Sequence, residues 1–191
     1  DIIIAEALSI LNKGGIIAYP TESFYALGVL ATDVVAVKKL FELKKRPADK
    51  PLPIIIGDSD ILLSIVKSVP DQAKDLIKRY WPGPLTIIFE AQDNVPALLT
   101  GWTGKVAVRI PGEGIALDLA KSLKMPVTAT SANPSASRPA ETSEEVINYF
   151  GDKVDLIIDA GEAPGGMPST IIDVTVVPPV VLREGRVLLH N

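Results

Sequence analysis

Residues 14–23 read Gly-Gly-Ile-Ile-Ala-Tyr-Pro-Thr-Glu-Ser, an apolar run between a glycine pair and a polar segment. The run at 15–19 is short and continuous, as expected of a buried strand. Before it, Ile4, Leu8 and Leu11 share one helical face, and the glycine pair is expected to end that helix. The stretch therefore predicts a helix that leads into a buried strand and then into a polar loop.

Helical and strand patterns alternate in the same way along the rest of the chain. Thr142-Ser143-Glu144-Glu145 has the spacing of a capping box, and Trp81-Pro82-Gly83-Pro84 is expected to end a helix because proline cannot continue one. We therefore expect one α/β domain over residues 1–191, built on a twisted, mixed, open sheet with flanking helices. Helices are predicted near 33–44, 73–80, 115–123 and 142–150, and strands near 53–56, 85–89, 106–110, 126–130, 154–158, 170–174, 180–182 and 187–189.

The composition excludes several function classes. A net charge of −4 gives no support for broad attraction to nucleic acids or membranes. The chain has no cysteine, which excludes disulfides and thiolate chemistry, and its only histidine is His190, so we predict no metal held by protein side chains. The N-terminus shows no secretory pattern and the apolar runs are too short to span a bilayer, so we expect a cytoplasmic protein without membrane contact.

Three predicted strands lead into short polar loops. Thr21 follows the first strand, Arg109 lies at the end of the strand near 106–110, and Ser131 and Asn133 follow the strand near 126–130. In open α/β sheets, ligands bind beyond the carboxyl ends of strands, so these loops are candidates to line one cleft. The alternative is that these residues only form turns and helix caps, which Thr, Ser and Asn do well.

Residues 38–50 form a basic segment, with six lysines and arginines against Glu42 and Asp49. A basic cluster in a net-acidic chain indicates a local anionic ligand. Lys44 and Arg46 lie where the predicted helix gives way to Pro47, so we expect both side chains to be exposed in the ligand-free protein. A guanidinium and a mobile ammonium suit phosphates. The alternative is a solvated helix face with cations near its C-terminus.

Nine short segments together resemble the YrdC-like family in order and spacing, and they cover nearly the whole chain. They are Gly-Gly-Ile-Ile-Ala-Tyr-Pro-Thr-Glu-Ser (14–23), Tyr-Ala-Leu-Gly (25–28), Leu-Lys-Lys-Arg-Pro (43–47), Lys-Pro-Leu (50–52), Trp-Pro-Gly-Pro-Leu-Thr (81–86), Val-Ala-Val-Arg-Ile-Pro (106–111), Ser-Ala-Asn (131–133), Pro-Ser-Thr-Ile-Ile-Asp (168–173) and Leu-Arg-Glu-Gly (182–185).

The resemblance implies a nucleotidyltransferase. Members of the family join L-threonine, bicarbonate and ATP into L-threonylcarbamoyl-adenylate, release pyrophosphate, and supply downstream enzymes that transfer the threonylcarbamoyl group to tRNA. Some members have an additional C-terminal domain, and we expect the stand-alone form here. Magnesium is expected to accompany ATP, held mainly by phosphates and waters.

The resemblance also assigns roles to residues. It places Lys44, Arg46, Ser131 and Asn133 in the catalytic signature, Thr21, Arg109 and Ser169 around threonine, and Arg46, Lys50, Ser131 and Arg183 around ATP. The sequence departs from the family pattern at Ser23 and Ala26, at Ile55, where some members have a histidine against the amino acid, and in the loop 134–139, which lacks the usual glycine.

Two other functions compete with the enzyme. A double-stranded RNA-binding module without chemistry would use the same basic segment, although RNA-binding domains usually have a wider basic surface. We expect at most a weak RNA contact. A small-molecule sensor that keeps the cleft without turnover is the third reading of the same residues.

Overall fold

The computed structural model describes residues 2–189, so His190 lies outside the described residues. None of the helices in this range is long and apolar enough to cross a membrane. The helices are α1 (Ile2–Asn12), α2 (Val34–Lys44), α3 (Asp71–Tyr80), α4 (Ile115–Leu123) and α5 (Ser143–Phe150), with 3-10 turns η1 (Ser59–Ser64) and η2 (Gly151–Lys153). The strands are β1 (Ile17–Pro20), β2 (Tyr25–Gly28), β3 (Ile54–Ile55), β4 (Leu85–Glu90), β5 (Lys105–Arg109), β6 (Val127–Thr128), β7 (Thr130–Ser131), β8 (Leu156–Ile157), β9 (Thr170–Asp173) and β10 (Val180–Arg183).

Side-chain caps fix the starts of two helices, α2 and α5. The Asp33 side chain accepts a hydrogen bond from the Ala36 amide at 2.9 Å and so caps α2. Thr142 caps α5 by accepting from the Glu145 amide at 3.2 Å. The Glu145 carboxylate reaches back one residue further than in a standard capping box and accepts from the Glu141 amide at 2.6 Å. Both helix starts therefore follow the sequence prediction.

The strands form two mixed sheets, where one was expected. The smaller sheet has the order β7-β2-β1-β8 and the larger one β10-β9-β4-β5-β3-β6. The pairs β1–β8, β3–β5 and β4–β9 are parallel, and the other ladders are antiparallel. The predicted class, α/β with mixed sheet pairing and flanking helices, is confirmed, but the pairing is divided between two sheets.

The division occurs inside the segment that was predicted as one strand at 126–130. Thr128 pairs with Ile54 in the larger sheet, whereas Thr130 pairs with Leu27 in the smaller sheet. The backbone changes sheets at Ala129, whose amide donates to the carbonyl of Pro53 at 3.0 Å. The prediction of a single strand over 126–130 is therefore wrong, because a strand-like sequence pattern does not show where a strand changes its pairing partner.

The predicted strand at 187–189 is also wrong. The Thr170 hydroxyl donates to the Val187 carbonyl at 2.7 Å and accepts from the amides of Val187 at 3.1 Å and Gly185 at 3.0 Å. A side chain thus satisfies backbone groups that a ladder would otherwise pair. The segment remains irregular although all three of its residues are apolar.

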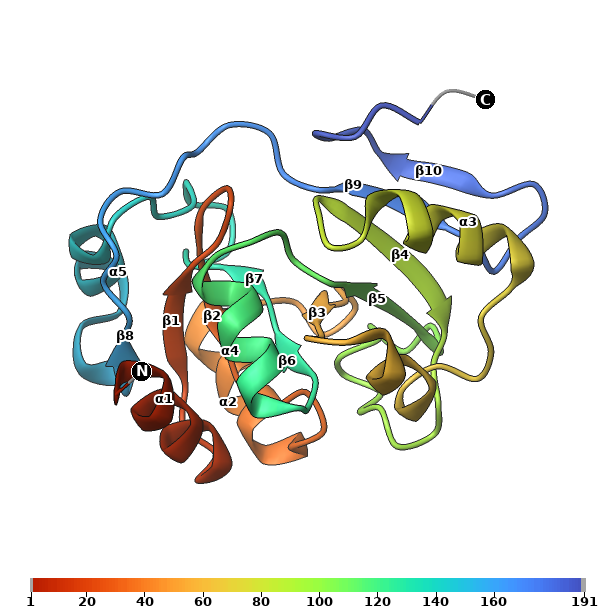
Figure 1. Cartoon of the computed structure of the whole chain (residues 1–191). Coiled ribbons are helices and arrows are strands. Elements are labelled where there is room, and N and C mark those ends of the chain that lie inside the picture. Colours follow the sequence, from red (N-terminus) through yellow and green to blue (C-terminus); the bar gives the residue numbers. More distant parts are fainter. Residues whose placement is uncertain (1, 190–191) are drawn as a thin grey trace.

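Two apolar clusters form the core. In the smaller cluster, α1 and α4 lie side by side, as Figure 1 shows, and pack Leu11 and Leu119 together with Ile17 of β1. The larger cluster joins β2, α2 and the strands β3, β4 and β5 through residues such as Leu27 and Val108. The edge strand β10 lies farthest from this packing and has exposed side chains (Figure 1).

Candidate active site

A cavity of about 520 Å³ is lined by residues from both sheets. Its walls come from the loop after β1, from the ends of β5, β7 and β10, and from the turn before β9. Six of the nine predicted site residues line it, namely Thr21, Arg46, Arg109, Ser131, Ser169 and Arg183. Lys44, Lys50 and Asn133 do not. A second hollow of about 630 Å³, beside the end of α1, contains none of the predicted site residues.

Among residues 2–189, three arginines and no carboxylate line this cavity. Arg46 donates to the Pro51 carbonyl at 2.7 Å, and Arg183 donates to the Ser169 carbonyl at 2.8 Å. Because these partners are neutral carbonyls, they orient the two guanidinium groups without cancelling their charge. Burial lowers the pKa of both, and the charge of Arg109 adds to the effect on Arg183. Since arginine stays protonated in proteins, the cavity is positively charged and suited to anions.

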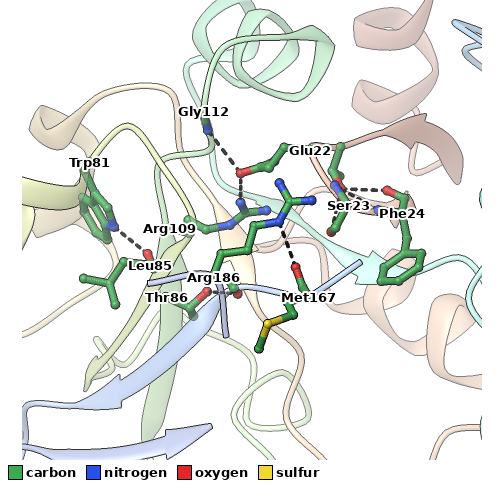
Figure 2. Close-up of polar contacts among 12 residues, drawn as sticks. Glu22, Ser23, Phe24, Trp81, Leu85, Thr86, Arg109, Gly112, Met167 and Arg186 are labelled. Atoms are coloured by element: carbon green, nitrogen blue, oxygen red, sulfur yellow. Dashed lines mark hydrogen bonds and ion pairs between the residues drawn. The ribbon is translucent and has the colours of Figure 1, made fainter. Parts of the chain in front are cut away.

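Arg109 is the most enclosed of these arginines, with 9% of its surface exposed. It lies at the end of β5, and its Nη1 donates to the carboxylate of Glu22 from the loop after β1. The same Glu22 oxygen accepts from the Gly112 amide at 3.3 Å, as Figure 2 shows. One carboxylate thus joins the loop after β1 to the end of β5.

Lys44 differs from the prediction. It was expected to be exposed, but only 1% of its surface is accessible. Its Nζ donates to the carbonyl of Ser131 and, at 2.7 Å, to that of Asn133. Burial, and to a smaller degree the charge of Arg46, lower the pKa of Lys44 to about 7. The Lys44 side chain is buried at the end of α2, so it supports the loop that carries Ser131 and does not line the cavity.

The contacts of Asn133 and Lys50 involve backbone carbonyls beside the cavity. Asn133 is buried, and its Nδ2 donates to the carbonyl of Ser137 at 2.9 Å, which holds the loop after Ser131 in a compact turn. The Lys50 side chain is exposed, but its carbonyl accepts from the Arg46 Nε at 3.2 Å. Neither side chain lines the cavity, so the structure places both residues beside it.

The hydroxyl residues have structural contacts as well. The Thr21 hydroxyl donates to the Phe24 carbonyl at 2.7 Å, so Thr21 does form the turn that the alternative reading proposed. The Ser169 hydroxyl lies 2.8 Å from that of Thr86, a buried residue of β4 that also lines the cavity. Sequence reasoning missed Thr86, because it lies within an apolar strand, and Glu22, because nothing in the sequence pairs it with Arg109.

Comparisons with known proteins show which family the chain resembles. A family model for the Sua5, YciO and YrdC proteins, described as telomere recombination, matches residues 9–185. The chain is 43% identical over 185 residues to a threonylcarbamoyl-AMP synthase of Pyrococcus abyssi, covering 97% of this chain and 54% of that protein. It is 39% identical over 170 residues to a threonylcarbamoyl-AMP synthase of Idiomarina loihiensis, covering 88% and 91%.

A solved structure is also similar. The crystal structure of P. abyssi Sua5 complexed with L-threonine superposes with a TM-score of 0.91 at 43% identity, covering 95% of this chain and 54% of that one. The chain therefore spans about half the length of the P. abyssi protein. The family match covers most of the described residues, including every arginine of the cavity. The chain belongs to the Sua5/YciO/YrdC family.

Proposed function

We propose that this chain is a nucleotidyltransferase that makes L-threonylcarbamoyl-adenylate from L-threonine, bicarbonate and ATP. The observation that carries the proposal is the cavity, whose lining in the described part of the chain has three arginines and no carboxylate. Two of the proposed substrates carry anionic groups that such a cavity can bind, the triphosphate of ATP and the carboxylate of threonine. Relatives with the name threonylcarbamoyl-AMP synthase, and a similar protein crystallised with L-threonine, support this assignment.

The cavity residues divide between the two substrates. We assign Arg109, Thr21 and Ser169 to threonine, because a guanidinium binds a carboxylate through two parallel hydrogen bonds and hydroxyls complement the other polar groups. We assign Arg46, Arg183 and Ser131 to ATP, because two guanidiniums can neutralise the triphosphate. Lys44 and Asn133 support the loop of Ser131. Lys50 does not line the cavity, but its side chain is exposed, and we propose that it contacts ATP from beside the cavity.

The chemistry needs positioning and charge neutralisation more than a covalent nucleophile. The threonine nitrogen forms a bond to the carbon of bicarbonate and water leaves, which gives a carbamate. A carbamate oxygen then bonds to the α-phosphorus of ATP while the bond to the bridging oxygen of the β-phosphate breaks. Pyrophosphate leaves with the electron pair. The cavity arginines stabilise the negative charge that develops on the phosphates.

Magnesium fits this site only as a companion of ATP. Within residues 2–189 no group of three or more His, Cys, Asp or Glu side chains could hold a metal ion. The hydroxyls of the cavity, such as that of Ser131, suit a cation that is coordinated mainly by phosphates and waters. Magnesium would screen the charge of the triphosphate, and the arginines would orient it.

The product defines the next partner. A mixed anhydride between a carbamate and AMP is an activated acyl donor, so we propose that an enzyme that transfers the threonylcarbamoyl group to an adenosine of tRNA consumes it. The cavity opens to solvent, which allows such a hand-over without a covalent intermediate on this chain.

The test is a reaction with the purified protein, L-threonine, bicarbonate, magnesium and ATP. We expect pyrophosphate release that depends on threonine, together with an adenylate that contains threonine. Arg183→Ala should lower the rate strongly, whereas Arg79→Ala, an exposed arginine of α3, should not. Pyrophosphate release that does not depend on threonine, or ATP binding without any adenylate, would disprove the proposal.

A further inference from the structure

We propose that Glu22 is a positioning residue that determines which edge of the Arg109 guanidinium faces the cavity. This inference rests on the proposed function, because it takes the threonine carboxylate as the ligand of Arg109. Glu22 itself does not line the cavity, whereas Arg109 does. Glu22 therefore acts on the substrate through Arg109.

The contacts of Glu22 hold the Arg109 guanidinium in place. Both side chains are mostly enclosed, with 11% of the Arg109 side chain and 20% of the Glu22 side chain exposed. The Gly112 amide donates to the same Glu22 oxygen, so the carboxylate is fixed by the loop that follows β5 (Figure 2). A partly buried carboxylate with two donors is a rigid anchor for a guanidinium.

The anchor leaves a free edge on Arg109. Among the described residues, the hydrogen bond from Arg109 to Glu22 uses Nη1, and neither Nε nor Nη2 has a partner. A guanidinium is planar and offers two donors along each edge, so the Nε–Nη2 edge can receive a carboxylate in bidentate fashion. Because Arg109 lines the cavity, the free edge is available to a ligand there.

The neighbouring charges explain why an anchor is needed. Arg183 lines the same cavity, and the charge of Arg109 contributes to the lowered pKa of Arg183, so the two guanidiniums repel each other. Glu22 offsets this repulsion through its ion pair with Arg109. Arg186, which Figure 2 shows beside Arg109, donates to the carbonyls of Met167 at 3.0 Å and Gly165 at 2.9 Å. Its guanidinium is therefore held by backbone oxygens and not by Glu22.

The experiment compares Glu22→Ala and Glu22→Gln with the wild type in threonine-dependent pyrophosphate release. For Glu22→Ala we expect the KM for L-threonine to rise roughly 10- to 100-fold, the range for a misplaced binding group, while the KM for ATP stays within about threefold. Glu22→Gln keeps an oxygen that can accept from Arg109 and Gly112, so it should restore most of the affinity. Glu113→Ala, which removes an exposed carboxylate next to Gly112, is the matched control and should have no effect.

A second measurement separates positioning from a purely structural role. We would compare L-threonine with L-threoninamide, which lacks the carboxylate, as competing ligands in calorimetry. The wild type should prefer threonine, and Glu22→Ala should lose most of this preference. Equal loss of affinity for threonine and ATP with a lower melting temperature, or an unchanged preference in Glu22→Ala, would overturn the inference. A wild type that binds no threonine would instead overturn the proposed function.

Discussion

Lys44 provides a quantitative test, because an ammonium is buried at the end of α2. The folded protein has a Lys44 pKa of about 7, against an ordinary value of 10.5. Between these two pH values the unfolded chain binds a proton that the folded protein does not. The free energy of unfolding should therefore rise with pH in this window, and the cost of burying the charge is fully present below pH 7.

The size of the effect follows from proton linkage. One group contributes at most about 1.4 kcal/mol per pH unit, so about 2 to 3 kcal/mol between pH 7 and pH 9 is the upper limit. The carbonyls of Ser131 and Asn133 favour the ammonium form and reduce this value. We expect at least about 1 kcal/mol.

The assay is urea unfolding of the wild type and Lys44→Met from pH 6 to pH 9. Lys44→Met leaves two carbonyls with one donor fewer at every pH, which shifts the whole curve by a constant amount. The substitution also removes the titrating ammonium, so the slope that Lys44 contributes above pH 7 is lost. The difference in unfolding free energy between wild type and variant should therefore change with pH above 7, in favour of the wild type. Lys38→Met, on the exposed side of the same helix, should follow the wild type. Parallel curves for the wild type and Lys44→Met would refute a displaced Lys44 pKa.

Three further predictions concern ligands. Arg109→Ala should weaken L-threonine binding by about 2–4 kcal/mol in calorimetry and leave ATP binding nearly intact, because only threonine loses a charge-assisted pair. Equal losses of threonine and ATP affinity would indicate misfolding. Arg46→Ala should lower turnover roughly 100-fold, because its charge stabilises the transferring phosphates. The melting temperature should change little, because its partners are backbone carbonyls at the surface. Normal turnover would support the alternative that Arg46 belongs only to a solvated helix face. Binding to a short RNA duplex should be weaker than about micromolar at physiological salt, in a salt titration, because Lys44 is buried and the basic segment 38–50 is short and partly offset by Glu42 and Asp49. Tight, salt-steep binding without ATP binding would favour the RNA-binding alternative.

The sequence predicted those parts of the fold that depend on neighbours along the chain. The caps at Asp33 and Thr142, the proline stop after Tyr80 and the apolar runs of β1 and β4 are local, and all of them are present. The division into two sheets was not predicted, because no local pattern indicates that Thr128 and Thr130 pair with different strands. Strand partners are chosen by contacts between segments that are distant in the sequence.

The site shows the same limit. Polar residues after strands pointed to Thr21, Arg109 and Ser131, since their positions follow from the strand ends. Lys44 was placed in solvent because a lysine at a helix C-terminus is usually exposed, and only the loop from the other sheet supplies the carbonyls that make its burial possible. Glu22 could have been found only from its distance to Arg109, which no spacing in the sequence encodes.

The change of sheets at Ala129 has a consequence for cooperativity. The cavity takes Thr21 from near the start of the chain and Arg183 from near its end, and each sheet contributes one wall. A partly folded chain with only one sheet would hold half of the contacts and bind neither substrate well. A ligand that touches both walls binds only when both sheets are formed, so it stabilises them together by mass action. With the cavity filled, the two sheets should therefore unfold as a single unit.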